Sequence, residues 1–193
     1  MRRILAFVMR SPARRWIGSV ACCAVSTQIW SQAQSISKPT EYQVKAAYLY
    51  NFARFVTWPA NGAASAENTV AMCVVGDGSF ATMLETTGAN LVIEGKPTIV
   101  RRLPTAEAAG TCSVLFISAS ARLPPDQVSA AIHQRGVLTV SDLPEFARRG
   151  GIIQFVIEGS RIRFEVNLAA ADQAGLTLSS ELLKVARAVR RTP

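Results

Sequence analysis

The chain has 193 residues, 49% of them hydrophobic, and a formal net charge of +8 at pH 7. The positive charge is uneven, because residues 1–33 hold five arginines and no acidic residue. The rest of the chain carries 16 basic and 13 acidic residues, a net charge of +3 with both signs scattered. A small, scattered charge does not indicate a nucleic-acid-binding surface. We therefore expect no DNA or RNA partner.

Residues 1–33 have the features of an export signal. A basic start precedes the mostly apolar run 16–25, and Ser31 and Ala33 stand at positions −3 and −1 of a cleavage site. The apolar run is too short to span a bilayer. The sequence predicts a cleavable signal peptide at residues 1–33. A lipoprotein box at residues 19–22, a twin-arginine signal at residues 14–15 and an uncleaved anchor are the alternatives, which N-terminal sequencing separates.

The mature chain keeps two cysteines, Cys73 and Cys112, because Cys22 and Cys23 lie in the predicted signal. An even pair in an exported protein indicates one disulfide bond. Two buried free thiols are the alternative, since cysteine is often a small core residue. We favour the bond because adjacent buried strands would carry both cysteines.

About 160 mature residues suffice for one domain with its own core. In chain order the pattern predicts a helix at 40–56, capped by Thr40 and stopped by Pro59. It then predicts strands at 69–75, 91–93, 98–100, 113–117 and 137–140, and helices at 79–87, 124–133 and 143–148. An antiparallel pair at 152–157 and 162–166 follows, and helices at 168–174 and 179–189 close the chain. This alternation predicts a single α/β domain, residues 40–191, with a mixed β-sheet flanked by helices on both faces.

The sequence contains few residues that could form a catalytic site. His133 is the only histidine, and no G-x-S-x-G motif is present. One histidine and two cysteines that we expect to be oxidised supply no zinc or copper cluster. We therefore expect no enzymatic activity, no metal and no cofactor.

Two short segments could bind an anion or another ligand. Gly76, Asp77, Gly78 and Ser79 follow a predicted strand, open a predicted helix and match G-x-G-x-x-A, the outline of a dinucleotide fingerprint. The strand–turn–helix geometry alone would also favour these residues. The second segment is basic and contains Arg148, Arg149, Gly150 and Gly151. An ordinary helix end with a glycine cap explains that corner better.

The helix predicted at 40–56 is apolar on most of its sides. Such a helix is either buried all round or leaves apolar surface for a partner. Tyrosine and tryptophan suit the second role, because both are amphipathic and enriched at interface hot spots. Tyr48, Tyr50 and Trp58 are therefore the candidates for partner binding, and the direction in which their side chains face decides the question.

Five segments give the chain its resemblance to a known family. EYQVKAAYLYNFARFVTWP, AMCVVGDGSF, CSVLFIS, VLTVSDLPEFARRGGIIQFVIEG and RIRFEVNLAAADQAGLTLSSELLKVA cover nearly the whole mature chain. Together they resemble the YfiR family of exported proteins.

The resemblance implies an α/β protein of the periplasm that can form homodimers. It further implies a repressor that binds the periplasmic sensor domain of an inner-membrane diguanylate cyclase and so limits cyclic-di-GMP and biofilm formation. Cys73 and Cys112 match one family disulfide. The second bridge of some members would fall near residues 142–151, where this chain has no cysteine. A periplasmic small-molecule-binding module that serves a transporter or receptor is the alternative function.

Overall fold

The structure, a computed structural model, describes residues 40–60, 67–132 and 135–191. The predicted signal peptide and His133 lie outside the described residues, so neither prediction is tested. The described residues all belong to one compact unit. Within the described ranges, no helix is both long enough and apolar enough to cross a bilayer.

Helix α1, Glu41–Arg54, begins where the sequence predicts it. The Thr40 side chain accepts a hydrogen bond from the Gln43 amide, and the Gln43 side chain accepts one from the Thr40 amide at 2.7 Å. This capping box satisfies amides that the first helical turn leaves unpaired. The predicted start is confirmed, and the helix ends at Arg54, two residues earlier than expected.

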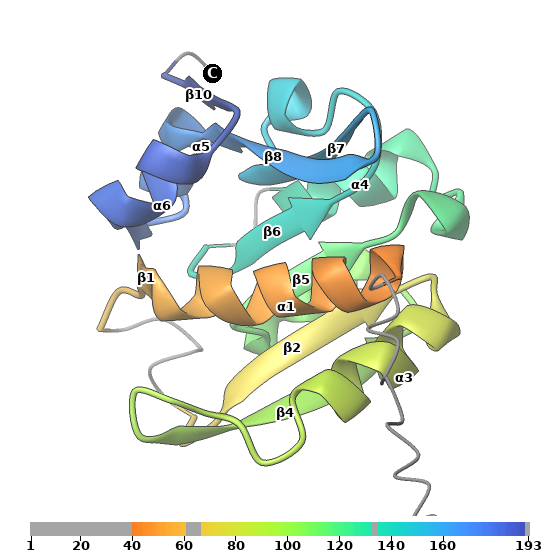
Figure 1. Ribbon diagram of the computed structural model, residues 1–193, viewed down its shortest axis with the longest axis vertical. Helices are drawn as coiled ribbons and strands as arrows, with labels where there is room; N and C mark the ends of the chain where they lie inside the picture. The colour runs from red at the N-terminus through yellow and green to blue at the C-terminus, as the bar shows by residue number, and fades with distance from the viewer. Residues whose placement is uncertain (1–39, 61–66, 133–134, 192–193) are drawn as a thin grey trace, which may run out of the picture. The chain divides into compact units, whose positions relative to one another are not determined.

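Eight strands of the described chain form one mixed sheet (Figure 1). Its spatial order is β10-β8-β7-β6-β5-β2-β4-β3, and only the β7–β8 and β3–β4 pairs are antiparallel. The strands are β2 (Val70–Val75), β3 (Val92–Ile93), β4 (Lys96–Leu103), β5 (Val114–Ile117), β6 (Leu138–Ser141), β7 (Ile153–Glu158), β8 (Arg161–Asn167) and β10 (Ala188–Arg190).

Helices cover both faces of this sheet, so the predicted fold class is confirmed. Met72 and Val74 of β2 belong to a core with α1 and α3 (Gly78–Thr87), whereas Cys73 and Val75 belong to a second core with α4 (Pro125–Ile132) and the 3₁₀ helix η1 (Ala106–Thr111). This alternation follows from the two-residue period of a strand that is buried on both faces. The remaining elements are η2 (Ala119–Ala121), η3 (Ala147–Arg149), α5 (Leu168–Gln173), α6 (Ser180–Val185), and the small pair of β1 (Val56–Thr57) with β9 (Thr177–Leu178).

The predicted disulfide bond is confirmed. Cys73 on β2 and Cys112 just before β5 are bonded to each other, and both are fully buried in the second core. Closing a loop of 39 residues stabilises the fold by about 3–4 kcal/mol in the chain-entropy model. The bond is inaccessible to solvent in the folded protein.

The predicted helix at 179–189 is wrong in its second half. Helix α6 ends at Val185, Ala186 is extended, and residues 188–190 form β10 beside β8. The Arg187 amide donates to the carbonyl of Phe164 at 2.8 Å. The open edge of β8 offers this segment a hydrogen-bonded ladder, and that tertiary pairing outweighs the helical pattern of its sequence. The helix predicted at 143–148 is also wrong, because only the 3₁₀ turn η3 forms there.

Candidate functional site

Tyr50 faces inward and does not reach the surface. Its side chain is 5% exposed, and its hydroxyl donates to the carbonyl of Leu84 on α3 at 2.8 Å. Gly88 makes room for the ring, since a Cβ at that position would lie 2.0 Å from the Tyr50 hydroxyl oxygen. Burial, and to a smaller extent the charge of Glu85, raises the pKa of Tyr50 to about 12. Tyr50 therefore ties α1 to α3 and is corrected from partner candidate to core residue.

Tyr48 and Trp58 are both half-buried, at different places. Tyr48 stacks on Phe52 with 5.6 Å between ring centroids and meets Phe164 edge-on at 5.5 Å. Its hydroxyl donates to the carbonyl of Ile162 at 3.5 Å, the outer limit of a hydrogen bond. Trp58 donates its indole N–H to the Ser113 carbonyl at 3.3 Å and lines a cavity of about 100 Å³. Tyr48, in contrast, borders a large opening between described residues.

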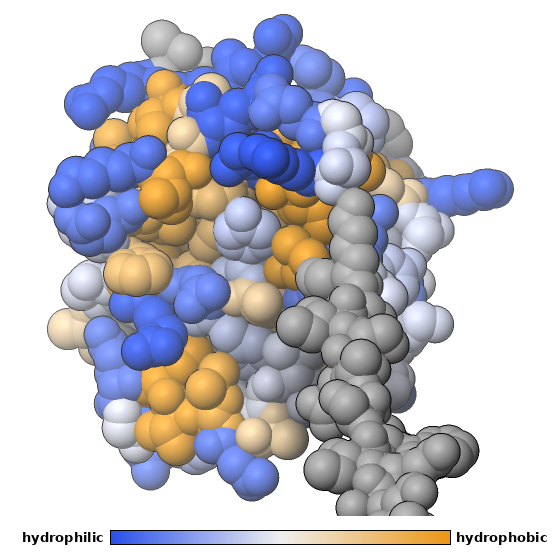
Figure 2. Space-filling view, viewed as in Figure 1, coloured by the Kyte–Doolittle hydropathy of each residue, from blue (hydrophilic) through white to orange (hydrophobic). Residues whose placement is uncertain are grey.

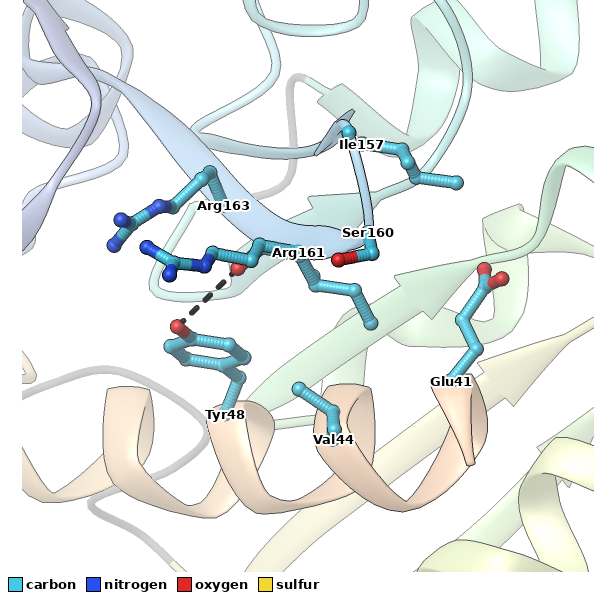
Figure 3. A pocket seen from close by; sticks show the side chains of 9 residues that line it. Glu41, Val44, Tyr48, Ile157, Ser160, Arg161 and Arg163 are labelled. Atoms are coloured by element: carbon cyan, nitrogen blue, oxygen red, sulfur yellow. Dashed lines mark hydrogen bonds between the residues drawn. The ribbon is translucent and has the colours of Figure 1, made fainter. Parts of the chain in front are cut away.

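That opening, which we call the hairpin groove, lies between α1 and the β7–β8 hairpin (Figure 3) and has a volume of about 660 Å³. The helix supplies one wall and the end of the hairpin the other. Figure 2 shows apolar surface between α1 and the hairpin, beneath a band of strongly hydrophilic side chains. The lining residues are Glu41, Val44, Tyr48, Ile157, Gly159, Ser160, Arg161, Ile162 and Arg163.

The hairpin groove combines an apolar floor with positive charge that is not neutralised. Tyr48 and Ile162 are partly buried against the core, whereas Ile157 is 66% exposed. Within the described ranges neither Arg161 nor Arg163 forms an ion pair, whereas Arg187 and Arg190 both contact Glu165. Exposed apolar atoms beside unpaired guanidinium groups are typical of surfaces that bind another molecule.

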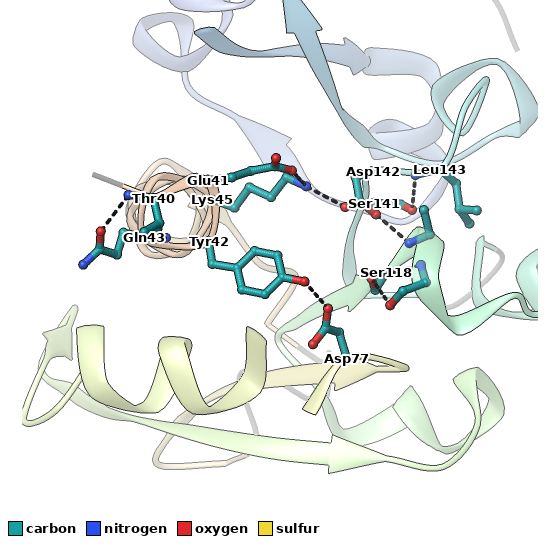
Figure 4. Close-up of polar contacts among 12 residues, drawn as sticks. Thr40, Glu41, Tyr42, Gln43, Lys45, Asp77, Ser118, Ser141, Asp142 and Leu143 are labelled. Carbon is teal, nitrogen blue, oxygen red and sulfur yellow. Dashed lines mark hydrogen bonds and ion pairs between the residues drawn. The ribbon is translucent and has the colours of Figure 1, made fainter. Parts of the chain in front are cut away.

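The first turns of α1 also contact the residues that follow β2 and β6. Lys45 is buried, and its ammonium group contacts Asp142 at 2.6 Å and Glu41 at 2.5 Å (Figure 4). The other oxygen of Asp142 accepts a hydrogen bond from the Ala119 amide at 2.6 Å. Burial alone would lower the pKa of Lys45, but the hydrogen bonds and charges of Asp142 and Glu41 outweigh it and raise the pKa. Lys45 is therefore charged and paired.

Tyr42 makes a matching contact beside this ion pair. Its hydroxyl donates to Asp77 at 2.5 Å, and Asp77 also accepts from the Phe80 amide as the N-cap of α3. The hydrogen bond to Asp77 raises the pKa of Tyr42 to about 12. Burial alone would raise the pKa of Asp77, but hydrogen bonds from Tyr42 and from the Phe80 and Ser79 amides outweigh it and lower the pKa. We call Tyr42, Lys45, Asp77 and Asp142 the strand-end junction.

The candidate anion site at Gly76, Asp77, Gly78 and Ser79 is not supported by this geometry. A phosphate at the N-terminus of α3 would meet the ionised carboxylate of Asp77, which already takes the amide hydrogen bonds. Gly76 serves packing, because its φ is +97° and a Cβ there would lie 2.1 Å from the Cβ of Ala121. The dinucleotide-like pattern is thus corrected to a capped helix start.

The second candidate anion site, residues 148–151, is the C-terminal end of the 3₁₀ turn η3. Arg148 pairs with Glu145 at 3.0 Å, both side chains are exposed, and Gly150 ends η3 in the left-handed conformation. The ring of Phe146 packs where a side chain at residue 151 would lie. Gly150 and Gly151 therefore shape the turn and its packing, as the simpler sequence interpretation held.

Sequence reasoning missed Lys45 and Asp142 of the strand-end junction and Arg161 and Arg163 of the hairpin groove. Lys45 and Asp142 are 97 residues apart, so no local pattern pairs them. Arg163 could have been found from the sequence, because it alternates with apolar residues on the predicted strand 162–166, and Arg161 directly precedes that strand. In the described ranges, no three histidine, cysteine, aspartate or glutamate residues gather as metal ligands.

Comparisons with known proteins agree with this architecture. A family model described as YfiR/HmsC-like matches residues 42–187, so the resemblance noted in the sequence is confirmed. A crystal structure of a conserved domain protein from Vibrio cholerae O1 biovar El Tor str. N16961 is similar with a TM-score of 0.51 at 12% identity. The match covers 80% of this chain and 62% of that one, and at this identity it shows the fold alone. No match was found among curated proteins.

Proposed function

We propose that this chain, which belongs to the YfiR/HmsC-like family, is a periplasmic regulator of cyclic-di-GMP signalling that acts without catalysis. It binds the periplasmic sensor domain of an inner-membrane diguanylate cyclase and holds the cyclase inactive. The buried Cys73–Cys112 bond supports an oxidising compartment, because disulfides persist in exported proteins.

The hairpin groove is the observation that carries this proposal. It offers partly exposed apolar side chains, Tyr48 and Ile157, next to Arg161 and Arg163, which form no ion pair with another described residue. Protein interfaces concentrate binding energy in such apolar centres, and charges at the rim select the partner and speed its approach. A sensor domain that presents an apolar side chain beside acidic residues is complementary to this surface.

Deletion of the gene tests the regulatory role. Loss of a repressor should raise cellular cyclic-di-GMP and biofilm mass, and expression of the exported protein from a plasmid should reverse both. Cyclic-di-GMP is measured by mass spectrometry of cell extracts, across growth phases and under redox stress. Unchanged levels in all these conditions would contradict the proposal.

Direct binding tests the partner. The periplasmic domain of each membrane diguanylate cyclase of the same bacterium is purified, and its affinity for the mature protein is measured by calorimetry. At least one domain should bind with a Kd in the micromolar range or tighter, roughly −8 kcal/mol or stronger. Absence of binding to every domain of the panel would refute the partner assignment.

The volume of the hairpin groove favours one second candidate, a small-molecule-binding module for a transporter or receptor. About 660 Å³ lies in the range of small-molecule sites, which span roughly 300–1,000 Å³. Native mass spectrometry of the protein purified from periplasm should then reveal a retained ligand, and Arg161→Ala should release it. Retention of a ligand together with unchanged cyclic-di-GMP in the deletion strain would favour this candidate over the first.

A further inference from the structure

Strand β7 extends past the end of its neighbour β6. The parallel register between them contains only Val140↔Ile153 and Ser141↔Gln154, because β6 ends at Ser141. On its other side β7 pairs with β8 through Glu158. In the described part of the chain, residues 155–158 therefore have no neighbouring strand on the β6 side.

The hairpin geometry fixes which backbone groups face this open side. Glu158 and Arg161 close a two-residue turn, and the closing pair of such a hairpin is hydrogen-bonded. Because hydrogen-bonded and non-bonded pairs alternate in an antiparallel ladder, Val156 also bonds to β8, whereas Phe155 and Ile157 point their backbone groups away. The register places the Ser141 carbonyl opposite the Phe155 amide. The Phe155 carbonyl and both backbone groups of Ile157 are left without a strand to pair with.

A cavity lies next to the unpaired backbone groups of Phe155 and Ile157. A cavity of about 340 Å³ borders this part of β7 and the first turns of α1. Its lining residues are Glu41, Lys45, Asp142, Pro144, Gln154, Phe155, Val156 and Ile157. Glu41 and Ile157 line both this cavity and the hairpin groove, so the two openings adjoin at the end of the hairpin.

We propose that the open edge of β7 binds an extended segment of the partner by β-strand addition. The segment lies beside β7 in the position that β6 would occupy if it extended past Ser141. It forms hydrogen bonds with the Phe155 carbonyl and with the amide and carbonyl of Ile157. Strand addition supplies main-chain hydrogen bonds, and alternate side chains of the added strand give specificity. The identity of the partner as a cyclase sensor domain rests on the proposed function.

The surroundings define the chemistry of this segment. The exposed Ile157 side chain suits an apolar residue of the segment on the same face of the sheet. In the cavity, the carboxylates of Glu41 and Asp142 outnumber the single ammonium of Lys45, and the Glu41 side chain is 46% exposed. A lysine or arginine of the segment is complementary to that excess negative charge.

The test is Ile157→Pro with Ile157→Thr as the matched control. Proline removes the amide on the open side and leaves the ladder to β8 intact, which is how proline is tolerated at strand edges. Threonine keeps the amide and a β-branched side chain. Affinity is measured by calorimetry for the sensor domain that binds wild-type protein. Both variants change the Ile157 side chain, and only proline also removes the amide, so we expect Kd to rise at least roughly tenfold more for proline than for threonine.

Hydrogen exchange on wild-type protein gives a second readout that needs no variant. The amide of Ile157 should exchange more slowly in the complex than in the free protein, because the added strand protects it. Equal affinity of both variants, or unchanged exchange at Ile157, would overturn the inference while leaving the proposed function intact. Failure of wild-type protein to bind any sensor domain would overturn both.

Discussion

Two of the places where helix α1 meets the rest of the fold differ in how fully their polar groups are paired. At the strand-end junction, Lys45 contacts two carboxylates, and the Tyr42 hydroxyl donates a hydrogen bond to the Asp77 oxygen that does not cap α3. At the hairpin groove, Arg161 and Arg163 have no ion pair in the described ranges, and Ile157 is mostly exposed. The same helix therefore has its charged groups paired at the strand ends and faces unpaired arginines at the hairpin.

The junction occupies the place where open α/β sheets usually bind ligands. Strand β2 lies between β4 and β5, and the chain passes from β2 to β4 and then back across β2 to β5. Such a reversal of strand order creates a crevice beyond the carboxyl ends of the strands. Here the side chains of Tyr42 and Lys45 lie in that position and satisfy Asp77 and Asp142. The binding surface is found instead at the hairpin, where pairing is incomplete.

The largest expected effect is on stability, from Lys45→Met at the junction. Removal of the ammonium leaves the carboxylates of Asp142 and Glu41 without their shared cation, and breaking a buried ion pair typically costs about 3–5 kcal/mol. Because Asp142 is partly exposed, we expect a loss of about 2–3 kcal/mol in the free energy of unfolding, measured by urea denaturation. The control is Lys184→Met, which breaks the exposed pair with Glu181 and should cost less than about 1 kcal/mol. Equal losses in the two variants would contradict a closed, stabilising junction.

The second effect is on binding, from the double variant Arg161→Ala and Arg163→Ala in the groove. Neither guanidinium forms an ion pair within the part of the chain that the structure describes, so the free energy of unfolding should change by less than about 0.5 kcal/mol. Affinity for the sensor domain should fall roughly ten- to hundredfold, mainly through slower association. The matched control is Arg148→Ala with Arg149→Ala, an equal change of charge at an exposed turn. Comparable weakening by both pairs would mean that net charge, and not the groove, attracts the partner.

The sequence predicted the parts of this fold that depend on local chemistry. The capping residue Thr40 predicted the start of α1, and the Gly159–Ser160 turn follows from the strand patterns on either side. The C-terminal segment failed because residues 188–190 are governed by the free edge of β8, which no local window contains. Lys45 and Asp142 were missed for the same reason. Tyr50 was predicted to bind a partner because it is aromatic. Its side chain points inward because α3 packs against α1, and the sequence of α1 alone does not show that contact.

The smallest effect concerns the other half of the junction, the hydrogen bond between Tyr42 and Asp77. Its loss in Tyr42→Phe should cost about 1 kcal/mol at pH 7. The folded-state pKa of Asp77 lies below its unfolded value of about 3.9, so its contribution is complete above that pH and is lost as the pH falls through the folded pKa. Urea denaturation from pH 7 to pH 2.5 should therefore show the difference between wild type and variant shrinking in acid. A difference that stays constant over this range would show that Asp77 is not held ionised by Tyr42. The junction would then be closed by Lys45 alone.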